Sequence, residues 1–375
     1  MFRPAALLLL LLTLALGWGA AGAQAAPYSA HSMVQSCCTP FGQKKTVFAE
    51  AHAMGARYIR LDVSLEGTFE HWGAEAAQPN WSGVDEVARL ARRYRLRVSA
   101  VINGTPSHIS SCEERRLEYT HCAPTDPGQF GAYAARVVAR APDVFRAVEV
   151  WNEPDAQWTF QGTPEQYADM LKATYAAVKR RFPRVKVLIG GATSLGSRDW
   201  YARAIAAGAA GSFDVANVHV RGPVASLAST IRRWRRFFRD HGHAGPLWVT
   251  EAGYPSETSA QYDEHYRGGE AAQAAYLRDS LPAMVGAGAC QVFVIERDAW
   301  VSEWGENPMN TEGVVQMAEH EPFPARRKPA FGVVRRLAAS ARPRACGRGR
   351  CRARGPCAHP TSRTARARSS SRESR

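Results

Sequence analysis

The chain has 375 residues, of which 45% are hydrophobic, and a formal net charge of +14. One α/β barrel of about 250 residues with insertions fits this length, so we expect a single folded domain. The charge is concentrated at the C-terminus: residues 335–375 hold thirteen arginines and one glutamate, or +12, which leaves +2 for the other 334 residues. The folded part is therefore close to neutral, which argues against specific nucleic-acid binding as the main function.

The N-terminal segment has the three parts of a secretory signal peptide. Arg3 gives a positive start, residues 5–16 are almost continuously apolar, and Ala23-Gln24-Ala25 is a small-x-small cleavage pattern. We predict a signal peptide over residues 1–25 and a secreted, extracellular protein. The alternative is an uncleaved membrane anchor, but the apolar run is shorter than the roughly 20 residues that a spanning helix needs. No transmembrane segment is expected beyond this one.

Short β-rich runs alternate with amphipathic helices along the rest of the chain. The strands are predicted at residues 29–36, 57–63, 97–102, 147–152, 186–189, 213–219, 247–251 and 290–295. The helices are predicted at residues 44–54, 84–94, 130–140, 164–181, 199–207, 226–240, 270–285 and 329–337. This alternation predicts parallel β-α-β units, and eight units close a (β/α)8 TIM barrel, a single α/β domain over residues 26–338. An open doubly wound sheet is the alternative, but no Gly-x-Gly-x-x-Gly follows the first clear strand.

Eight cysteines in an exported chain favour disulfides. Cys112 and Cys122 bracket a polar loop, and we predict that they are bonded. Cys37 and Cys38 are adjacent, and because a bond between neighbours is strained, we expect each of them to pair elsewhere or to stay reduced. No paired Cys-x-x-Cys spacing with a histidine partner occurs, so no zinc site is predicted.

The composition changes near residue 339 to arginine, alanine, serine, proline, glycine and cysteine, without apolar periodicity. Such a segment cannot bury enough surface to fold, so we predict a disordered Arg-rich tail over residues 339–375. It should attract polyanions without specificity. A basic tail that binds a cell wall is the alternative.

Two of the predicted strands end in a glutamate that is followed by a turn. Glu153 ends the run from residue 148, and Pro154, which cannot donate to a ladder, biases Glu153 toward extended geometry. Glu251 ends the run from residue 247, ahead of a glycine and a proline. In a barrel these are the carboxyl ends of strands four and seven, so both glutamates are expected at the face where barrel enzymes react.

The motifs Trp151-Asn152-Glu153-Pro154 and Thr250-Glu251-Ala252-Gly253-Tyr254-Pro255 together resemble the acid/base and nucleophile strands of clan A retaining glycoside hydrolases, in particular family 39-like enzymes. The resemblance covers residues 57–337 and implies a (β/α)8 barrel, a carbohydrate substrate, no metal and no organic cofactor. It implies that Glu153 is the acid/base and Glu251 the nucleophile, with the carboxyl groups about 5–5.5 Å apart. The alternative is a pair of surface loop glutamates.

Three polar residues are assigned to substrate binding by the same resemblance. Asn152 is implied to donate to the sugar 2-hydroxyl, with capping of the strand turn as its alternative. Arg60 is implied to orient the nucleophile, although a salt bridge to Glu149 inside the barrel is equally compatible with the pattern. His219 matches a histidine that bonds near the nucleophile, and its alternative is a satisfied core residue.

The sequence departs from the family after the sixth strand. Relatives continue with His-x-Tyr or His-Pro-Tyr, whereas this chain has Val220 and Arg221 after the histidine. The departure removes the expected tyrosine hydroxyl beside the nucleophile, and Tyr254 is the predicted substitute.

Other rim positions are predicted to bind sugar. Asp298 and Trp300 resemble the sugar-binding end of strand eight, with plain packing as the alternative for Trp300, and His108 is a subsite candidate after strand three. Three further loop aromatics are expected to line a groove: Trp158, Phe160 and Trp304.

We therefore expect a secreted retaining glycoside hydrolase that cleaves O-glycosidic bonds of a polysaccharide or oligosaccharide. One alternative is a carbohydrate-binding pseudoenzyme on the same barrel, and another is a basic wall-associated protein that acts through its tail. Because both glutamates are present, the sequence favours catalysis. It makes no prediction of the sugar or of the oligomeric state.

Overall fold

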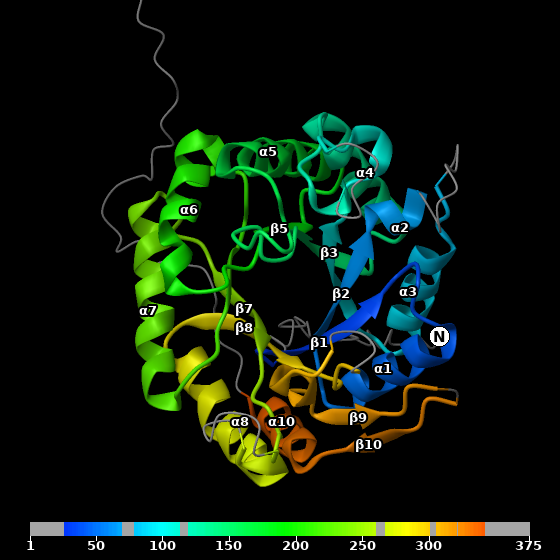
Figure 1. Ribbon diagram of the computed structural model, residues 1–375, viewed down its shortest axis with the longest axis vertical. Coiled ribbons are helices and arrows are strands. Elements are labelled where there is room, and N and C mark those ends of the chain that lie inside the picture. The colour runs from blue at the N-terminus through cyan, green and yellow to red at the C-terminus, as the bar shows by residue number, and fades with distance from the viewer. Residues whose placement is uncertain are drawn as a thin grey trace, which may run out of the picture.

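The computed structural model describes residues 26–69, 79–112, 119–259, 267–300, 305–320 and 322–341. Eight parallel strands form one sheet in the order β5-β4-β3-β2-β1-β8-β7-β6. Figure 1 shows the strands at the centre and the helices as a ring around them. This is the (β/α)8 barrel that the alternation predicted, and the fold prediction is confirmed.

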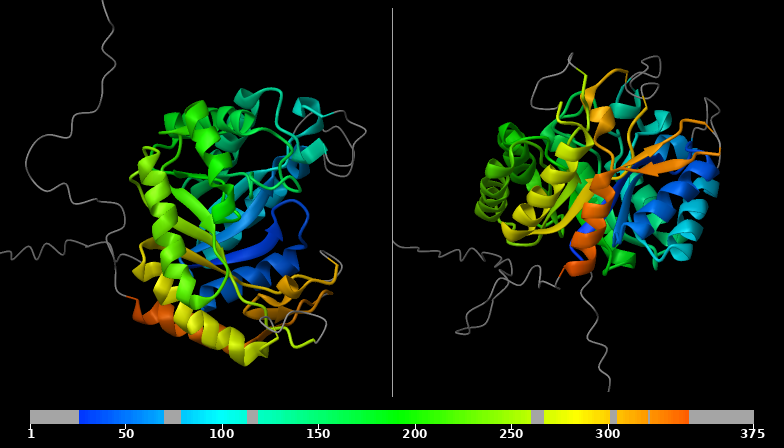
Figure 2. Two further views of the ribbon diagram at one scale, coloured as in Figure 1. Left: turned by 60° about the vertical axis from the view of Figure 1, so that its left-hand side comes forward. Right: turned by 90° about the horizontal axis from the view of Figure 1, so that it is seen from below.

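Each barrel strand overlaps a predicted one. The strands are β1 (Tyr28–Gln35), β2 (Tyr58–Ser64), β3 (Arg97–Asn103), β4 (Phe145–Val150), β5 (Lys186–Ile189), β6 (Ala216–His219), β7 (Leu247–Ala252) and β8 (Ala289–Ile295). The outer helices are α1 (Phe41–Ala53), α3 (Ser82–Arg93), α4 (Pro127–Arg140), α5 (Pro164–Arg181), α6 (Arg198–Ala204), α7 (Val224–Asp240), α8 (Gly269–Gly286) and α10 (Pro329–Ser340). The last helix packs beside α8 (Figure 2) and ends two residues beyond the predicted domain boundary.

One α-helix and two strands of the described residues were not predicted. The helix α2 (Leu65–Phe69) follows β2, and β9 (Val315–Met317) pairs antiparallel with β10 (Ala325–Arg327). This hairpin lies beside α1 in Figure 1, where Arg327 Nε contacts Glu50 Oε2 at 2.6 Å. All three elements are too short to show a periodic pattern in the sequence.

The barrel closes weakly between β5 and β6. These strands share isolated bridges, Leu188 with Val215 and Ala192 with Val218, in place of a continuous ladder. Backbone hydrogen bonds support the closure, from His219 N to Ala192 O at 2.9 Å and from Asp214 N to Val187 O at 2.7 Å. We call this junction the β5–β6 seam.

The interior of the barrel changes from apolar to charged along the strands. One cluster is apolar and consists of Tyr58, Ala147, Leu188, Val215, Trp248 and Phe293. Because inward-facing side chains recur every second residue, the next inward residues on β2 and β4 are Arg60 and Glu149. Both are almost fully buried, and the guanidinium meets the carboxylate at 2.8 and 2.9 Å. A buried charge needs such a partner, so this pair fixes Arg60 just below the barrel mouth.

The disulfides match one expectation and correct another. Cys112 and Cys122 are bonded as predicted, with Cα atoms 6.0 Å apart. Cys37 and Cys38 are bonded to each other, so the expectation that each pairs elsewhere or stays reduced is wrong.

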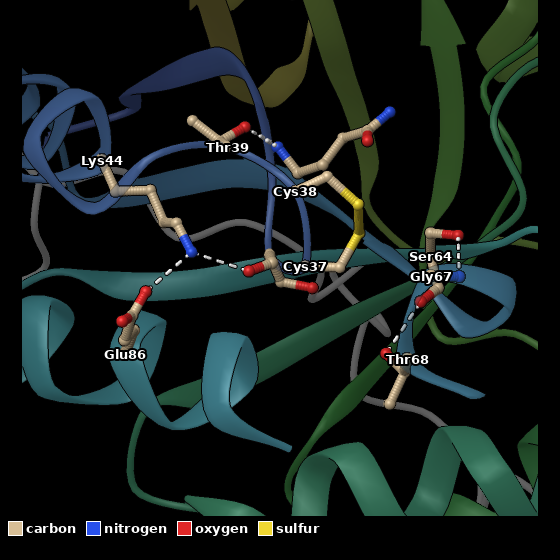
Figure 3. Close-up of a disulfide and its surroundings, with 10 residues drawn as sticks. Cys37, Cys38, Thr39, Lys44, Ser64, Gly67, Thr68 and Glu86 are labelled. Atoms are coloured by element: carbon tan, nitrogen blue, oxygen red, sulfur yellow. Dashed lines mark hydrogen bonds and ion pairs between the residues drawn. A yellow bond between two sulfur atoms is a disulfide. The ribbon is translucent and has the colours of Figure 1, made fainter. Parts of the chain in front are cut away.

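The turn after β1 explains the bond between the adjacent cysteines. Lys44 Nζ donates to Ser36 O at 2.7 Å and also pairs with Glu86 (Figure 3), while Ser36 N donates to Asp62 O at 2.9 Å. Across the turn, the missing side chain of Gly67 leaves the space that the Cys37 sulfur occupies. The expected strain applies to an isolated dipeptide, whereas here the surroundings determine the turn.

No helix in the described part of the chain is both long enough and apolar enough to cross a bilayer. The predicted signal peptide, residues 1–25, lies outside the described residues, as do Trp304 and the predicted tail from residue 342 onward.

Candidate active site

The side chains of Glu153 and Glu251 meet at the carboxyl ends of β4 and β7. His219 Nδ1 lies 2.7 Å from Glu153 Oε1 and 3.6 Å from Glu251 Oε2. One oxygen of each carboxylate and one histidine nitrogen lie within 4.8 Å of one another. The two carboxylate side chains are 17% and 13% exposed, so both are largely buried yet reachable from the barrel mouth.

The backbone at the end of β4 is left-handed, contrary to the extended geometry expected for Glu153. The φ angles are +69° at Trp151 and +47° at Glu153. Tertiary contacts override the local preference: Trp151 Nε1 donates to Thr159 O at 2.8 Å, and Ala156 N donates to Glu153 O at 3.0 Å. Such conformations cost about 1–3 kcal/mol each and persist where surrounding contacts determine them. The turn therefore holds the Glu153 carboxylate in one direction.

Arg60 connects the two glutamate-bearing motifs. It donates from Nη1 to Glu251 Oε1 at 3.0 Å and from Nη2 to Asn152 Oδ1 at 2.7 Å, in addition to its pair with Glu149. Arg60 thus contacts Glu251 and also forms the salt bridge with Glu149, so the two alternatives from the sequence are compatible. Because the Asn152 oxygen accepts from Arg60, the amide nitrogen of Asn152 is the donor that this side chain has left.

A neutral histidine completes the floor of the site. His31 Nδ1 lies 3.0 Å from Arg60 Nη1, and its Nε2 lies 3.7 Å from Glu251 Oε1. Burial and the charge of Arg60 lower the pKa of His31 to about 3. Since the guanidinium can only donate, Nδ1 accepts, and the hydrogen on Nε2 points toward Glu251.

His219 is held so that its Nδ1 forms a hydrogen bond with Glu153. Thr250 Oγ1 donates to Asn217 Oδ1 at 2.9 Å and so accepts from His219 Nε2 at 3.1 Å. That leaves Nδ1 for Glu153. Burial alone would lower the pKa of His219, but the charge of Glu251 and the hydrogen bond to Glu153 outweigh it and raise the pKa. Gly191 leaves the space for the ring, because a side chain there would collide with the imidazole.

A guanidinium stands beside Glu251 where a tyrosine was expected. Arg221 Nη2 lies 3.3 Å from Glu251 Oε2 and 2.7 Å from Glu312 Oε2, and Glu312 is 1% exposed. Tyr254, the predicted substitute, has its ring stacked on that of Tyr276, with ring centroids 4.5 Å apart. Sequence reasoning missed Arg221, Glu312 and His31; the only signal was the position of Arg221 two residues after His219.

The cations around Glu251 keep it ionised. Burial by itself would raise the pKa of this carboxyl, but the positive charges of His219, Arg60 and Arg221 outweigh burial and hold the pKa well below its usual range. Glu153, His219 and Glu251 also have the spacing of metal ligands. They fit a metal poorly, because Arg60 and Arg221 already donate to Glu251 and would repel a divalent cation.

The other predicted binding residues are engaged by partners outside this cluster. His108 Nε2 lies 3.1 Å from Tyr133 Oη, and Trp300 Nε1 donates to Met317 O at 3.0 Å. Asp298 pairs with Lys328 Nζ at 2.7 Å, and burial raises the pKa of Asp298 to about 6 despite that neighbour.

The loop aromatics separate into one exposed and one buried ring. Trp158 is 72% exposed, as a groove-lining residue requires. Phe160 is buried, with its ring 5.1 Å from that of Trp151, so the expectation that it lines a groove is wrong. Its role is to support the Trp151 turn from below.

Comparison with known proteins finds similarity to glycoside hydrolases. The family described as "Glycosyl hydrolase catalytic core" matches residues 125–317, just over half of the chain. No curated protein matches the sequence. Among solved structures, a family 39 glycoside hydrolase from Bacteroides cellulosilyticus WH2 has a TM-score of 0.61 at 16% identity, over 84% of this chain and 63% of that one.

Two further structures are similar. The GH39 enzyme of Xanthomonas axonopodis pv. citri has a TM-score of 0.61 at 20% identity, over 85% of this chain and 68% of that one. An exo-beta-1,4-mannosidase from Opitutaceae bacterium strain TAV5 has a TM-score of 0.58 at 19% identity, over 85% of this chain and 60% of that one. At these identities the likeness shows the fold.

Proposed function

The chain belongs to the glycosyl hydrolase catalytic core family, and on that premise we propose that it is a secreted retaining enzyme that cleaves O-glycosidic bonds of a polysaccharide or oligosaccharide. One observation carries the retaining assignment: an oxygen of Glu153 and an oxygen of Glu251 lie within 4.8 Å of each other. Retaining enzymes hold the two carboxyl groups about 5–5.5 Å apart, and inverting enzymes about 6.5–9.5 Å. The short spacing leaves no room for the sugar and an attacking water together between the two carboxylates, which supports direct attack by Glu251.

In the first step, Glu251 attacks the anomeric carbon while Glu153 gives its proton to the leaving oxygen. Glu251 is suited to this role because Arg60 and Arg221 keep it ionised. As positive charge develops on the sugar ring, the Asn152 amide donates to the 2-hydroxyl, a hydrogen bond that strengthens in the transition state. The products are the free alcohol and a glycosyl ester on Glu251.

In the second step, water replaces the enzyme at the anomeric carbon. Glu153, now a carboxylate, accepts a proton from the attacking water, and the ester C–O bond breaks to restore the Glu251 carboxylate. His219, 2.7 Å from Glu153, stabilises this charged form. Two displacements at one carbon return the original anomeric configuration.

Secretion is part of the proposal and rests on different features. The signal-peptide pattern over residues 1–25 supports export. Two disulfides, at Cys37–Cys38 and Cys112–Cys122, are consistent with an oxidising compartment. N-terminal sequencing of protein recovered from culture medium checks the cleavage site.

Covalent trapping tests the mechanism. A panel of nitrophenyl glycosides first identifies the sugar, and the enzyme is then treated with the corresponding 2-deoxy-2-fluoro glycoside. Mass spectrometry of peptides should locate the label on Glu251, and NMR should show a product with the anomeric configuration of the substrate. A label on another residue, or an inverted product, overturns the proposal.

A further inference from the structure

Helix α7 concentrates the basic charge of the folded domain. Five exposed arginines occur within eight residues, at positions 232, 233, 235, 236 and 239, and Asp240 is the one acidic residue of the helix. The helix therefore carries +4. Because residues 1–334 together carry +2, the part of that stretch outside α7 sums to −2.

The arginines of α7 have fewer carboxylate partners than their number would suggest. Single arginines on three other outer helices each meet a carboxylate: Arg92 of α3 with Asp143 at 2.7 Å, Arg140 of α4 with Asp85 at 2.5 Å and Arg203 of α6 with Glu165 at 3.0 Å. On α7, within the described part of the chain, the one such pair is Arg239 with Asp240 at 3.5 Å. The remaining four guanidiniums repel one another without a carboxylate partner, an arrangement that an anionic ligand would stabilise.

A groove follows the same face of the helix. Its volume is about 490 Å³, and its basic lining consists of Arg198, Arg232, Arg233 and Arg236. Phe237 and His241 add aromatic surface, with ring centroids 4.3 Å apart, and Asp240 also faces the groove. The groove thus combines guanidiniums, an aromatic face and one hydrogen-bond acceptor.

The groove is separate from the carboxylates but begins on their side of the barrel. Both α6 and α7 start after the carboxyl ends of their strands, and Arg198 is the first residue of α6. Asp240 and His241 lie at the opposite end of α7. Figure 1 shows α7 in the outer ring of helices, so a ligand there would lie along the side of the barrel.

We infer that the α7 groove binds an anionic polysaccharide and that the arginines contact the carboxylate or sulfate groups of that polymer. Guanidiniums pair with such groups through two parallel hydrogen bonds, and the apolar face of a sugar ring packs on an aromatic plane such as Phe237. Asp240 in the groove accepts hydrogen bonds from hydroxyls. Each ring of a sugar polymer carries such hydroxyls between its anionic groups, whereas a DNA backbone has none, so the mixed lining favours an anionic sugar polymer. The inference rests on the proposed function in taking the bound polymer to be the kind of molecule that the enzyme cleaves.

Binding of polygalacturonate to the full chain tests this inference. The triple variant Arg232→Gln, Arg233→Gln, Arg236→Gln should lose about tenfold or more in affinity at 0.15 M salt. The matched control removes three exposed arginines near the end of α5, with Arg180→Gln, Arg181→Gln, Arg184→Gln, and should stay within about twofold of the wild type. Neutral dextran should not bind either protein.

Two readouts keep this test independent of catalysis. Glu251→Gln should bind polygalacturonate like the wild type, and the α7 variant should hydrolyse a small nitrophenyl glycoside at the wild-type rate. Specific binding without any glycosidase activity would defeat the proposed function and leave the groove assignment standing. Equal losses in the α7 and α5 variants would overturn the inference. So would α7-dependent binding of a DNA duplex or phosphatidylglycerol vesicles that exceeds the binding of polygalacturonate.

Discussion

The ends of β4 and β7 present two glutamates with nearly equal exposure and opposite electrostatic surroundings. Glu251 has two fixed cations, Arg60 at 3.0 Å and Arg221 at 3.3 Å. Glu153 instead has a hydrogen bond to a titratable group, His219 at 2.7 Å. Since the exposed fractions are 13% and 17%, burial does not distinguish the two carboxylates. The different roles that we propose for them follow from which charges lie next to them.

The two surroundings also come from different sources. Glu251 is held by residues from distant parts of the chain, which a substitution at one position disturbs only in part. Glu153 is held by the turn that carries it, through the left-handed backbone at Trp151 and Glu153 itself. Substitutions at the ends of β4 and β7 should therefore reduce activity in different ways.

The largest effect is expected for Glu251→Gln. The amide keeps the shape of the carboxylate but cannot attack carbon, so kcat/KM on a nitrophenyl glycoside should fall on the order of 10⁴-fold or more. Circular dichroism should show an intact barrel. The matched control, Glu165→Gln at the surface pair with Arg203, should stay within about twofold. A Glu251 variant that keeps a tenth of the activity would place the nucleophile elsewhere.

Glu153→Ala should cost less, and its cost should depend on the leaving group. With a poor leaving group that needs a proton, kcat should fall about 10²- to 10⁴-fold. With dinitrophenolate, which leaves without a proton, the first step should remain fast and the ester should accumulate, because the second step lacks its base. Stopped-flow measurement should then show a burst of one dinitrophenolate per enzyme. Equal losses for both substrates would contradict the acid/base role.

The smallest effect is a shift of pH dependence when Arg221 is removed. The double variant Arg221→Met, Glu312→Gln takes out the pair without leaving an unpaired buried carboxylate. The pKa of Glu251, held well below its usual range in the folded protein, should rise. Activity requires ionised Glu251, so the acidic limb of kcat/KM should move to higher pH, by about one unit.

The same double variant should also change how the free energy of unfolding depends on pH. A depressed pKa means that ionised Glu251 stabilises the fold above its unfolded value of about 4.3, and that this stabilisation is lost as pH falls through the folded value. The double variant should lose less unfolding free energy than the wild type between pH 5 and pH 3.

Glu312→Gln alone is the control for the pH dependence of activity. Arg221 then pairs with Glu251 alone, and the acidic limb of kcat/KM should stay in place or move to lower pH.

The features that could be predicted from the sequence are those encoded within one element. Each barrel strand carries its own apolar pattern, and each glutamate lies at or within three residues of the end of its strand, so both were found. Arg221 and Glu312 are 91 residues apart, and nothing in either local sequence indicates the other. The pairing exists only after the barrel brings the end of β6 beside the segment before β9.

Two errors show tertiary contacts overriding local rules. A residue before proline prefers extended geometry, yet Glu153 is left-handed because Ala156 and Thr159 bind its carbonyl oxygen. Adjacent cysteines rarely bond, yet Cys37 and Cys38 do so in a turn that Lys44 and Asp62 hold from outside. Both preferences are correct for a short peptide and incomplete for a residue in a fold.

The β5–β6 seam has a mechanical consequence for the chemistry. β4, which delivers Glu153, pairs with β5, whereas β7, which delivers Glu251, pairs with β6. The backbone hydrogen bonds across the seam do not form a continuous ladder, so we expect the barrel to flex there first. The two halves that would part there carry one glutamate each, and the His219–Glu153 hydrogen bond joins them at the rim. We expect this hydrogen bond to limit how far the distance between the two carboxylates fluctuates.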